Sequence, residues 1–238
     1  MTNIDYDDLK KRGFLQAKKV GYFTLRTRAS CGNYSVGELE EIINISKIYG
    51  KGFIHTTVRQ GIEIPHIRFE HIKDIEERLR LSGIQAGTSG PRLRAITSCP
   101  GNNWCKRGLV DTFNLFNRIE TELGIKCSMD LPHKFKIVIS GCPNTCTRAQ
   151  ASEIGLYGDV SMLNNEKKTG YSAYIGGCGG KTPYTGFKLS RVFSEDEALS
   201  LVGKVVRFYK ENAKPRQRLA LLIKETGKDT FLKAINEA

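Results

Sequence analysis

Two pairs of cysteines, each set in a loop rich in glycine, proline and asparagine, constrain this chain more than any other feature of its sequence. Five residues separate Cys99 from Cys105, and three separate Cys142 from Cys146. Each pair follows a predicted strand, in the loops SCPGNNWC and GCPNTC. Such loops leave backbone N–H groups free to point at metal-bound sulfur. A shared ligand requires the two pairs to converge in space.

The spacing of the four thiols does not by itself decide which chemistry they serve. The N-terminal segment MTNIDYDDLKKRG lacks the apolar core of a signal peptide, so we expect a cytosolic protein. In that reducing compartment seven cysteines, an odd number, favour metal binding over a disulfide framework. Structural zinc usually takes ligand pairs with about two to four intervening residues, so the five residues between Cys99 and Cys105 are more than is usual for zinc. Soft thiolates fit a [4Fe–4S] cluster at least as well, and four unrelated structural cysteines are a third interpretation.

The first third of the chain is predicted to form strands and helices in the order β-α-β-β-α. Residues 21–28 alternate with period two, so Phe23, Leu25 and Thr27 face one side of a strand. A capping box at Ser35 begins a helix that ends near Gly50. The next elements are strands around 53–58 and 62–67 and a helix over 72–83.

The glycine-rich segment 83–91, GIQAGTSGP, is typical of a linker. We therefore place a first domain at residues 1–84 and a second at 85–238. Both contain helices and strands, which gives the α+β fold class.

The second part is predicted to alternate between strands and helices before it becomes helical from about Ser194. A strand is expected at 93–97, and a helix over 109–123 ends at a glycine. Lys134 and Lys136 share the face of a strand opposite Phe135, Ile137 and Ile139. The remaining expected elements are strands at 155–162 and 171–176 around the polar turn 164–170, NNEKKTG.

The formal charge of +12 needs an explanation. Nucleic-acid binding is the usual one, but Lys and Arg are spread along the chain without a dense basic run or a nucleic-acid motif. An internal polyanion is the alternative that we favour. No apolar run approaches the roughly 20 residues that span a bilayer, so neither a nucleic acid nor a membrane is expected as a partner.

The cysteine pattern, with GCPNTCTRAQASEIGLYGDV around the second pair, closely resembles the sulfite and nitrite reductase family that uses siroheme and a [4Fe–4S] cluster. The resemblance extends to GYFTLRTRASCG, FIHTTVRQGIE, LPHKFK and YIGGCGGK and so covers nearly the whole chain. It implies a small N-terminal ferredoxin-like half-domain followed by a siroheme- and [4Fe–4S]-binding α+β domain. Siroheme carboxylates and a negatively charged cluster would together carry a charge of roughly −10, which would offset most of the formal net charge of +12.

The resemblance also implies roles for individual residues. Four thiolates would bind the cluster, and the last of them would also bind the siroheme iron: Cys99, Cys105, Cys142 and Cys146. Two side chains would meet siroheme carboxylates: His55 and Arg59. Four cations would bind the substrate and relay protons: Arg26, Arg94, Lys134 and Lys136. Glu63 occupies a position where the family often has a neutral amide. The other cysteines are expected to be structural thiols: Cys31, Cys127 and Cys178.

The expected activity is the six-electron reduction of sulfite to sulfide. Reduction of nitrite to ammonia with the same cofactors is the nearest rival, and a non-catalytic siroheme and iron–sulfur electron-transfer protein is a second class. Larger members of the family contain two copies of the module, so this single copy is expected to form a homodimer that shares its active site. An external ferredoxin-like protein is the expected electron donor, because the sequence contains no flavin domain or second cysteine-rich motif.

Overall fold

The computed structural model describes residues 4–163 and 166–237 and divides the chain into two compact units, residues 1–90 and 91–238. Within the described residues, no helix combines the length and apolar character needed to cross a bilayer.

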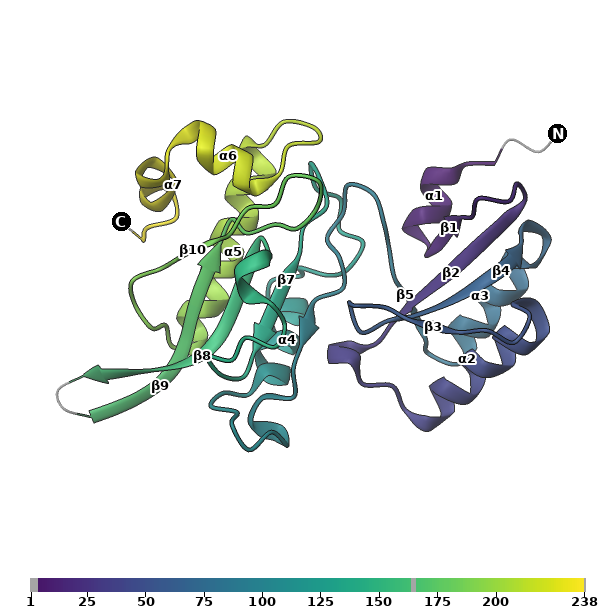
Figure 1. The fold of residues 1–238 in the computed structure, drawn as a ribbon, viewed down its shortest axis with the longest axis horizontal. Coiled ribbons are helices and arrows are strands. Elements are labelled where there is room, and N and C mark those ends of the chain that lie inside the picture. The colour runs from purple at the N-terminus through teal and green to yellow at the C-terminus, as the bar shows by residue number, and fades with distance from the viewer. Residues whose placement is uncertain (1–3, 164–165, 238) are drawn as a thin grey trace. The chain divides into compact units, whose positions relative to one another are not determined.

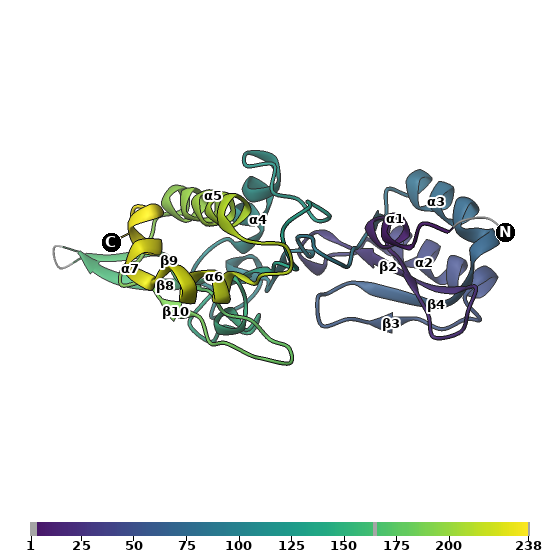
Figure 2. The ribbon, with the colours of Figure 1, turned by 90° about the horizontal axis from the view of Figure 1, so that it is seen from above.

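The first unit is an antiparallel sheet covered on one face by helices. The sheet has the order β1-β2-β4-β3, and β5 pairs with β2. Figure 2 shows the helices stacked over this sheet. The strands are β1 (Phe14–Gln16), β2 (Tyr22–Arg28), β3 (His55–Thr56), β4 (Ile62–Arg68) and β5 (Gln85–Ala86). The helices are α1 (Tyr6–Lys11), α2 (Val36–Tyr49) and α3 (Ile72–Leu81).

Local sequence patterns account for most of this unit. Phe23, Leu25 and Thr27 are all buried, as the period-two alternation predicts. Ser35 and Glu38 form the reciprocal capping box at the start of α2. The linker prediction is wrong at its start, because residues 85–86 form β5 and pair with β2. The sequence reasoning also missed α1 and β1, which are short.

The second unit contains a five-stranded sheet in the order β10-β9-β8-β7-β6. The first three of its strands along the chain run parallel, and β8 and β9 then form a long antiparallel hairpin that extends past the other strands in Figure 1. The strands are β6 (Thr97–Ser98), β7 (Ile137–Ser140), β8 (Ile154–Leu163), β9 (Glu166–Ile175) and β10 (Phe187–Lys188). The helices are α4 (Thr112–Thr121), α5 (Glu195–Asn212), α6 (Leu219–Thr226) and α7 (Lys228–Ala234).

Two expected elements of this unit begin later than the sequence suggests. The strand expected at 93–97 is limited to β6, and Leu93 makes only an isolated bridge to Phe135. Leu109 lies outside α4 because its N–H donates to the Gly141 carbonyl at 2.7 Å. Asp111 starts the helix instead, since its carboxylate accepts from the first free backbone N–H groups.

Two further expectations concern β7 and β9. Lys134 and Lys136 precede β7, which begins at Ile137, so the strand assignment for these lysines is wrong. The alternation persists nevertheless, because Phe135 is fully buried while both lysines are half-buried. Residues 166–170 belong to β9 rather than to a turn, and residues 164–165 lie outside the described residues.

Candidate functional site: two cysteine loops and a basic cluster

Parallel pairing of β6 and β7 brings the two cysteine loops to the same edge of the sheet. Ser98 pairs with Ile139 in this register. Cys99 follows β6 directly, and Cys142 lies two residues after the end of β7. Because parallel strands end on the same side, both loops leave the sheet at their shared carboxyl edge. The structure therefore brings together the two loops that carry the four predicted thiolate ligands.

Glycines allow these loops to pack backbone against backbone. A Cβ atom at Gly141 would lie 2.5 Å from the Gly101 Cα, and one at Gly108 would lie 2.2 Å from the Gly101 carbonyl carbon. Gly101 also has a φ of +56°, which favours glycine. No larger residue fits at this crossing without separating the loops. The glycines thus hold the first cysteine pair against the second.

A backbone N–H already points at one of the sulfurs. The Gly141 N–H donates to Cys99 Sγ at 3.0 Å, as expected for loops that bind metal-bound thiolate. Cys99 and Cys142 are half-buried, and Cys105 and Cys146 are exposed. All four thiols are free, so no disulfide competes for them.

The second loop is held in a strained, hydrogen-bonded turn around Cys146. The Ser140 and Thr147 hydroxyls are 2.7 Å apart, and the Thr147 N–H donates to Ser140 Oγ at 3.3 Å. Thr145 and Arg148, on either side, both have positive φ angles. Such angles cost free energy in residues with side chains. The turn therefore fixes the direction of the Cys146 side chain, which the sequence assigns to both cofactors.

The four thiols are soft ligands, which both zinc and iron–sulfur clusters accept. A tetrahedral zinc site needs four sulfurs within about 3.8 Å of one another, given a Zn–S bond of about 2.3 Å. Across residues 4–163 and 166–237, no group of three or more His, Cys, Asp or Glu is arranged to hold one metal ion. Four soft thiol ligands on two loops at one sheet edge suit the donor chemistry of a [4Fe–4S] group.

A second set of residues in the same unit forms a concentration of positive charge, here called the basic cluster. Its members are Arg94, His133, Lys134, Lys136, Arg216 and Arg218. Burial lowers the pKa of His133, and the positive charges of Arg218, Lys134, Arg94 and Arg216 lower it further. These groups are therefore near enough to repel a further proton. An anion bound here would relieve that repulsion.

Glu153 is the buried carboxylate that anchors the basic cluster. It accepts hydrogen bonds from Arg218 Nε at 3.0 Å, from Arg218 Nη2 and from the Lys136 backbone N–H at 2.9 Å. Its own carbonyl accepts from the Gly176 N–H at 2.9 Å. Burial raises the pKa of the Glu153 carboxyl, and the charges of Arg218 and Lys136 oppose that rise. The Glu153 carboxylate thus fixes the Arg218 guanidinium and the Lys136 backbone, and its backbone carbonyl holds the start of the glycine-rich loop that begins at Gly176.

The two predicted lysines differ in their surroundings. The Lys136 ammonium donates to the Ala151 carbonyl, and burial lowers its pKa from the usual lysine value. Lys134 lies beside the glycine-rich loop, because a Cβ atom at Gly180 would lie 3.8 Å from its Nζ. Sequence reasoning found these lysines but missed Glu153 and Arg218. The only local signal for Glu153 was a carboxylate placed directly before an apolar strand.

Three predicted site residues belong to the first unit. Arg26 lies opposite Glu63 on β2 and β4, and Glu63 lies opposite His55 on β3. Residues directly opposite one another in a sheet share a face, and here it is the face away from buried Leu25. Arg59 lies in the turn between β3 and β4, where its N–H donates to the Thr57 hydroxyl.

Glu63 is an ion-pair partner within the sheet. The Arg26 Nε donates to Glu63 Oε1 at 2.8 Å, and Arg26 Nη2 lies 2.6 Å from the same oxygen. Arg26 Nη1 also donates to the Thr88 carbonyl at 3.1 Å. Glu63, a carboxylate at a position where the family often has an amide, therefore orients Arg26, the predicted catalytic arginine.

The remaining cysteines occupy packed positions. Cys31 and Cys178 are buried and Cys127 is half-buried, which fits structural thiols. The predicted site residues thus form two sets, each organised within its own unit. The set of the first unit is Arg26, His55 and Arg59. The roles assigned to these side chains stay predictions.

Comparison with known proteins places the chain in a family. Residues 89–238 match the model of the nitrite and sulphite reductase 4Fe-4S domain, and residues 15–82 match that of the nitrite/sulfite reductase ferredoxin-like half domain. The chain belongs to the nitrite and sulfite reductase family. This family consists of reductases, and its cofactors are siroheme and a [4Fe–4S] cluster. The predicted family, fold class, enzyme class and cofactors are confirmed at this level.

The curated relatives include both sulfite and nitrite reductases. The chain is 32% identical to a coenzyme F420-dependent sulfite reductase of Methanocaldococcus jannaschii, over 98% of this chain and 44% of that protein. It is 28% identical to an assimilatory-type sulfite reductase of Nitratidesulfovibrio vulgaris, over 96% of this chain and 98% of that protein. A nitrite reductase [NAD(P)H] of Emericella nidulans is 28% identical over 92% of this chain and 19% of its own length. This chain thus spans less than half the length of the sulfite reductase of Methanocaldococcus jannaschii.

Solved structures support the fold. Dissimilatory sulfite reductase I matches with a TM-score of 0.80 at 16% identity, over 91% of this chain and 69% of that chain. The NirA protein of Mycobacterium tuberculosis matches with a TM-score of 0.83 at 20% identity, over 98% of this chain and 47% of its own. At these identities the likeness concerns the fold alone.

Proposed function

We propose that this reductase-family chain reduces sulfite to sulfide with six electrons, at a siroheme linked through Cys146 to a [4Fe–4S] cluster. Both cofactors would be held by the domain at residues 85–238. The observation that carries the proposal is the convergence of two glycine-packed cysteine loops, with Gly141 N–H on Cys99 Sγ. When bound, the cofactors supply electron storage and an iron that receives the substrate.

The basic cluster supplies what an oxyanion needs. Arg94, Lys134 and Lys136 would bind the anion through charge-assisted hydrogen bonds and stabilise the negative charge that develops as S–O bonds break. Lys136 is suited to donate protons, because burial has lowered its pKa and made its proton easier to release. Glu153 would keep the Lys136 backbone in place during this transfer.

The first unit supplies further cations. His55 and Arg59 would meet siroheme carboxylates, and Arg26 would act with the substrate-binding set. Planar guanidinium groups suit carboxylates because they donate two parallel hydrogen bonds. The ion pair between Arg26 and Glu63 supports this role by holding the guanidinium in one orientation.

Sulfite is favoured over nitrite as the substrate. The relative at 32% identity and the relative of matching length are both named sulfite reductases. Nitrite reduction to ammonia is the second candidate, because several relatives are named nitrite reductases. Steady-state assays with reduced viologen and each anion separate the two, and turnover with nitrite alone would reject the sulfite proposal.

The cofactor assignment has its own test. Protein purified without oxygen should show siroheme absorption together with cluster iron and acid-labile sulfide. Cys146→Ser should lose siroheme and turnover, because its sulfur would join both groups. A Cys146→Ser protein that keeps the siroheme, the cluster and full turnover would contradict the assignment. Zinc without iron would do the same.

We also propose a cytoplasmic homodimer that receives electrons from a ferredoxin-like donor. Relatives that are named ferredoxin-dependent support such a donor. In the dimer, Arg94, Lys134 and Lys136 of one chain would line the active site of the other. Sedimentation of a fully active holoprotein as a strict monomer would reject the shared site.

A further inference from the structure

A short loop next to the first cysteine pair has an unusual surface. Trp104, the single tryptophan of the chain, is 67% exposed. It precedes the exposed Cys105, which is followed by the exposed Lys106 and Arg107. Within the part of the chain that the structure describes, neither of these two cations has an ion pair or a side-chain hydrogen bond. The surface thus combines an aromatic ring, two unpaired positive charges and a cluster ligand.

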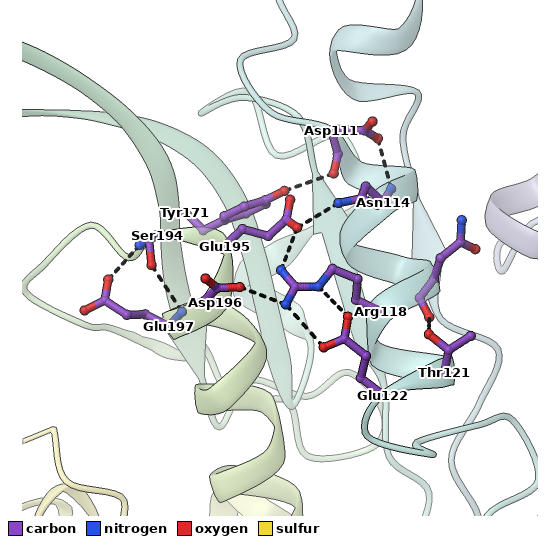
Figure 3. Close-up of polar contacts among 11 residues, drawn as sticks. Asp111, Asn114, Arg118, Thr121, Glu122, Tyr171, Ser194, Glu195, Asp196 and Glu197 are labelled. Atoms are coloured by element: carbon purple, nitrogen blue, oxygen red, sulfur yellow. Dashed lines mark hydrogen bonds and ion pairs between the residues drawn. The ribbon is translucent and has the colours of Figure 1, made fainter.

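Arg118, the one cation of the neighbouring helix α4, is neutralised, in contrast. Arg118 of α4 lies 2.7 Å from Glu122, 2.9 Å from Glu195 and 2.8 Å from Asp196, and Figure 3 shows this network. Each of its guanidinium nitrogens therefore has a carboxylate partner. The charges of Lys106 and Arg107 therefore differ from that of Arg118, because no carboxylate offsets them within the described residues.

The loop is also held in a fixed conformation. Asn103 Nδ2 donates to the Pro100 carbonyl at 3.1 Å and to the Asp111 carboxylate at 3.0 Å. The Asp111 carbonyl in turn accepts from the Tyr171 hydroxyl at 3.0 Å (Figure 3). Trp104 packs edge-on against Phe113, with ring centroids 5.2 Å apart. A rigid loop loses little entropy when a partner binds.

We propose that residues 102–107 form the docking surface for an acidic one-electron carrier protein. The proposal rests on the proposed function, because it gives the cluster at Cys105 its electron donor. Arginine and tryptophan are common binding hot spots, and opposite charges speed the encounter of transient partners. Each encounter transfers one electron from the carrier to the cluster and moves no atom. Six encounters would supply one sulfite reduction.

The charge of the loop is tested in the holoprotein with an acidic plant-type [2Fe–2S] ferredoxin. The double variant Lys106→Glu/Arg107→Glu should weaken ferredoxin binding in calorimetry at low salt by roughly tenfold or more. Added salt should weaken binding to the unaltered protein, because exposed charges are screened. Arg207→Glu/Lys210→Glu is the matched control, since it makes the same change in charge on exposed residues of α5. The control should change the affinity by less than about twofold.

Trp104 provides an independent readout. Ferredoxin binding should change the emission of this single tryptophan, and Trp104→Ala should weaken binding without a change in net charge. Equal loss of affinity in the loop variant and the α5 control would overturn the proposal, because it would show a general charge effect. Binding of a DNA duplex through Lys106 and Arg107 in preference to ferredoxin would also overturn it.

A small reductant separates this proposal from the proposed function. Reduced methyl viologen needs no protein docking surface, so viologen-driven turnover should be unchanged in Lys106→Glu/Arg107→Glu. Loss of that turnover together with ferredoxin binding would indicate cluster damage and overturn the docking surface. Loop-dependent ferredoxin binding without turnover of any oxyanion would support the surface and reject the proposed reductase activity.

Discussion

Replacing Glu153 by glutamine should destabilise the second unit more than any comparable change at the surface. The carboxylate is fully buried and Arg218 is 11% exposed, so the substitution leaves a buried guanidinium without a counter-charge. Breaking a buried pair in this way costs about 3–5 kcal/mol. For a unit of this size, that corresponds to a fall in melting temperature of roughly 6–20 °C.

Thermal and urea unfolding, followed by circular dichroism and by the emission of Trp104, measure this effect. Glu122→Gln is the matched control, because Glu122 pairs with Arg118 on the surface and is 50% exposed. The control should cost clearly less than Glu153→Gln, because solvent screens an exposed ion pair. The double variant Glu153→Gln/Arg218→Met should recover part of the loss, since no unpaired charge then remains buried. A cost for Glu153→Gln equal to that of the control would refute the reasoning.

Three further predictions concern the cofactor and substrate sites. Gly141→Ala should destabilise the cysteine loops by about 1–3 kcal/mol and reduce the amount of bound iron, because the new Cβ would lie 2.5 Å from a backbone atom. Gly203→Ala is the control and should retain iron, because its Cβ would lie 3.6 Å from the nearest atom. Anion affinity, followed by the siroheme spectrum with nitrite, should fall as pH rises from about 7 to about 10, because burial lowers the pKa of Lys136. Lys136→Arg should remove that part of the pH dependence. Glu63→Gln should loosen Arg26, which the ion pair holds in one orientation, and weaken nitrite binding in the siroheme spectrum, at a stability cost of about 1 kcal/mol; unchanged anion affinity would show that the pair does not position Arg26.

Sequence predicts features of this protein that depend on near neighbours. The alternation of Phe23, Leu25 and Thr27 gave the inward face of β2, because side-chain direction in a strand changes at every residue. The capping box at Ser35 gave the start of α2, because its partners are three residues apart. The spacing and composition of the cysteine loops left three interpretations open before any fold was known: a [4Fe–4S] cluster, structural zinc and four unrelated structural thiols.

Tertiary structure alone decided which distant groups meet. Glu153 and Arg218 are 65 residues apart, and Arg26 and Glu63 are 37 apart. No local pattern pairs such residues, because their contact depends on how the sheets are ordered and on how α6 packs. The same is true of the Gly141 N–H that meets Cys99 Sγ, which requires β6 and β7 to run parallel in one register. Strand order and register are long-range properties, so only the folded chain fixes them.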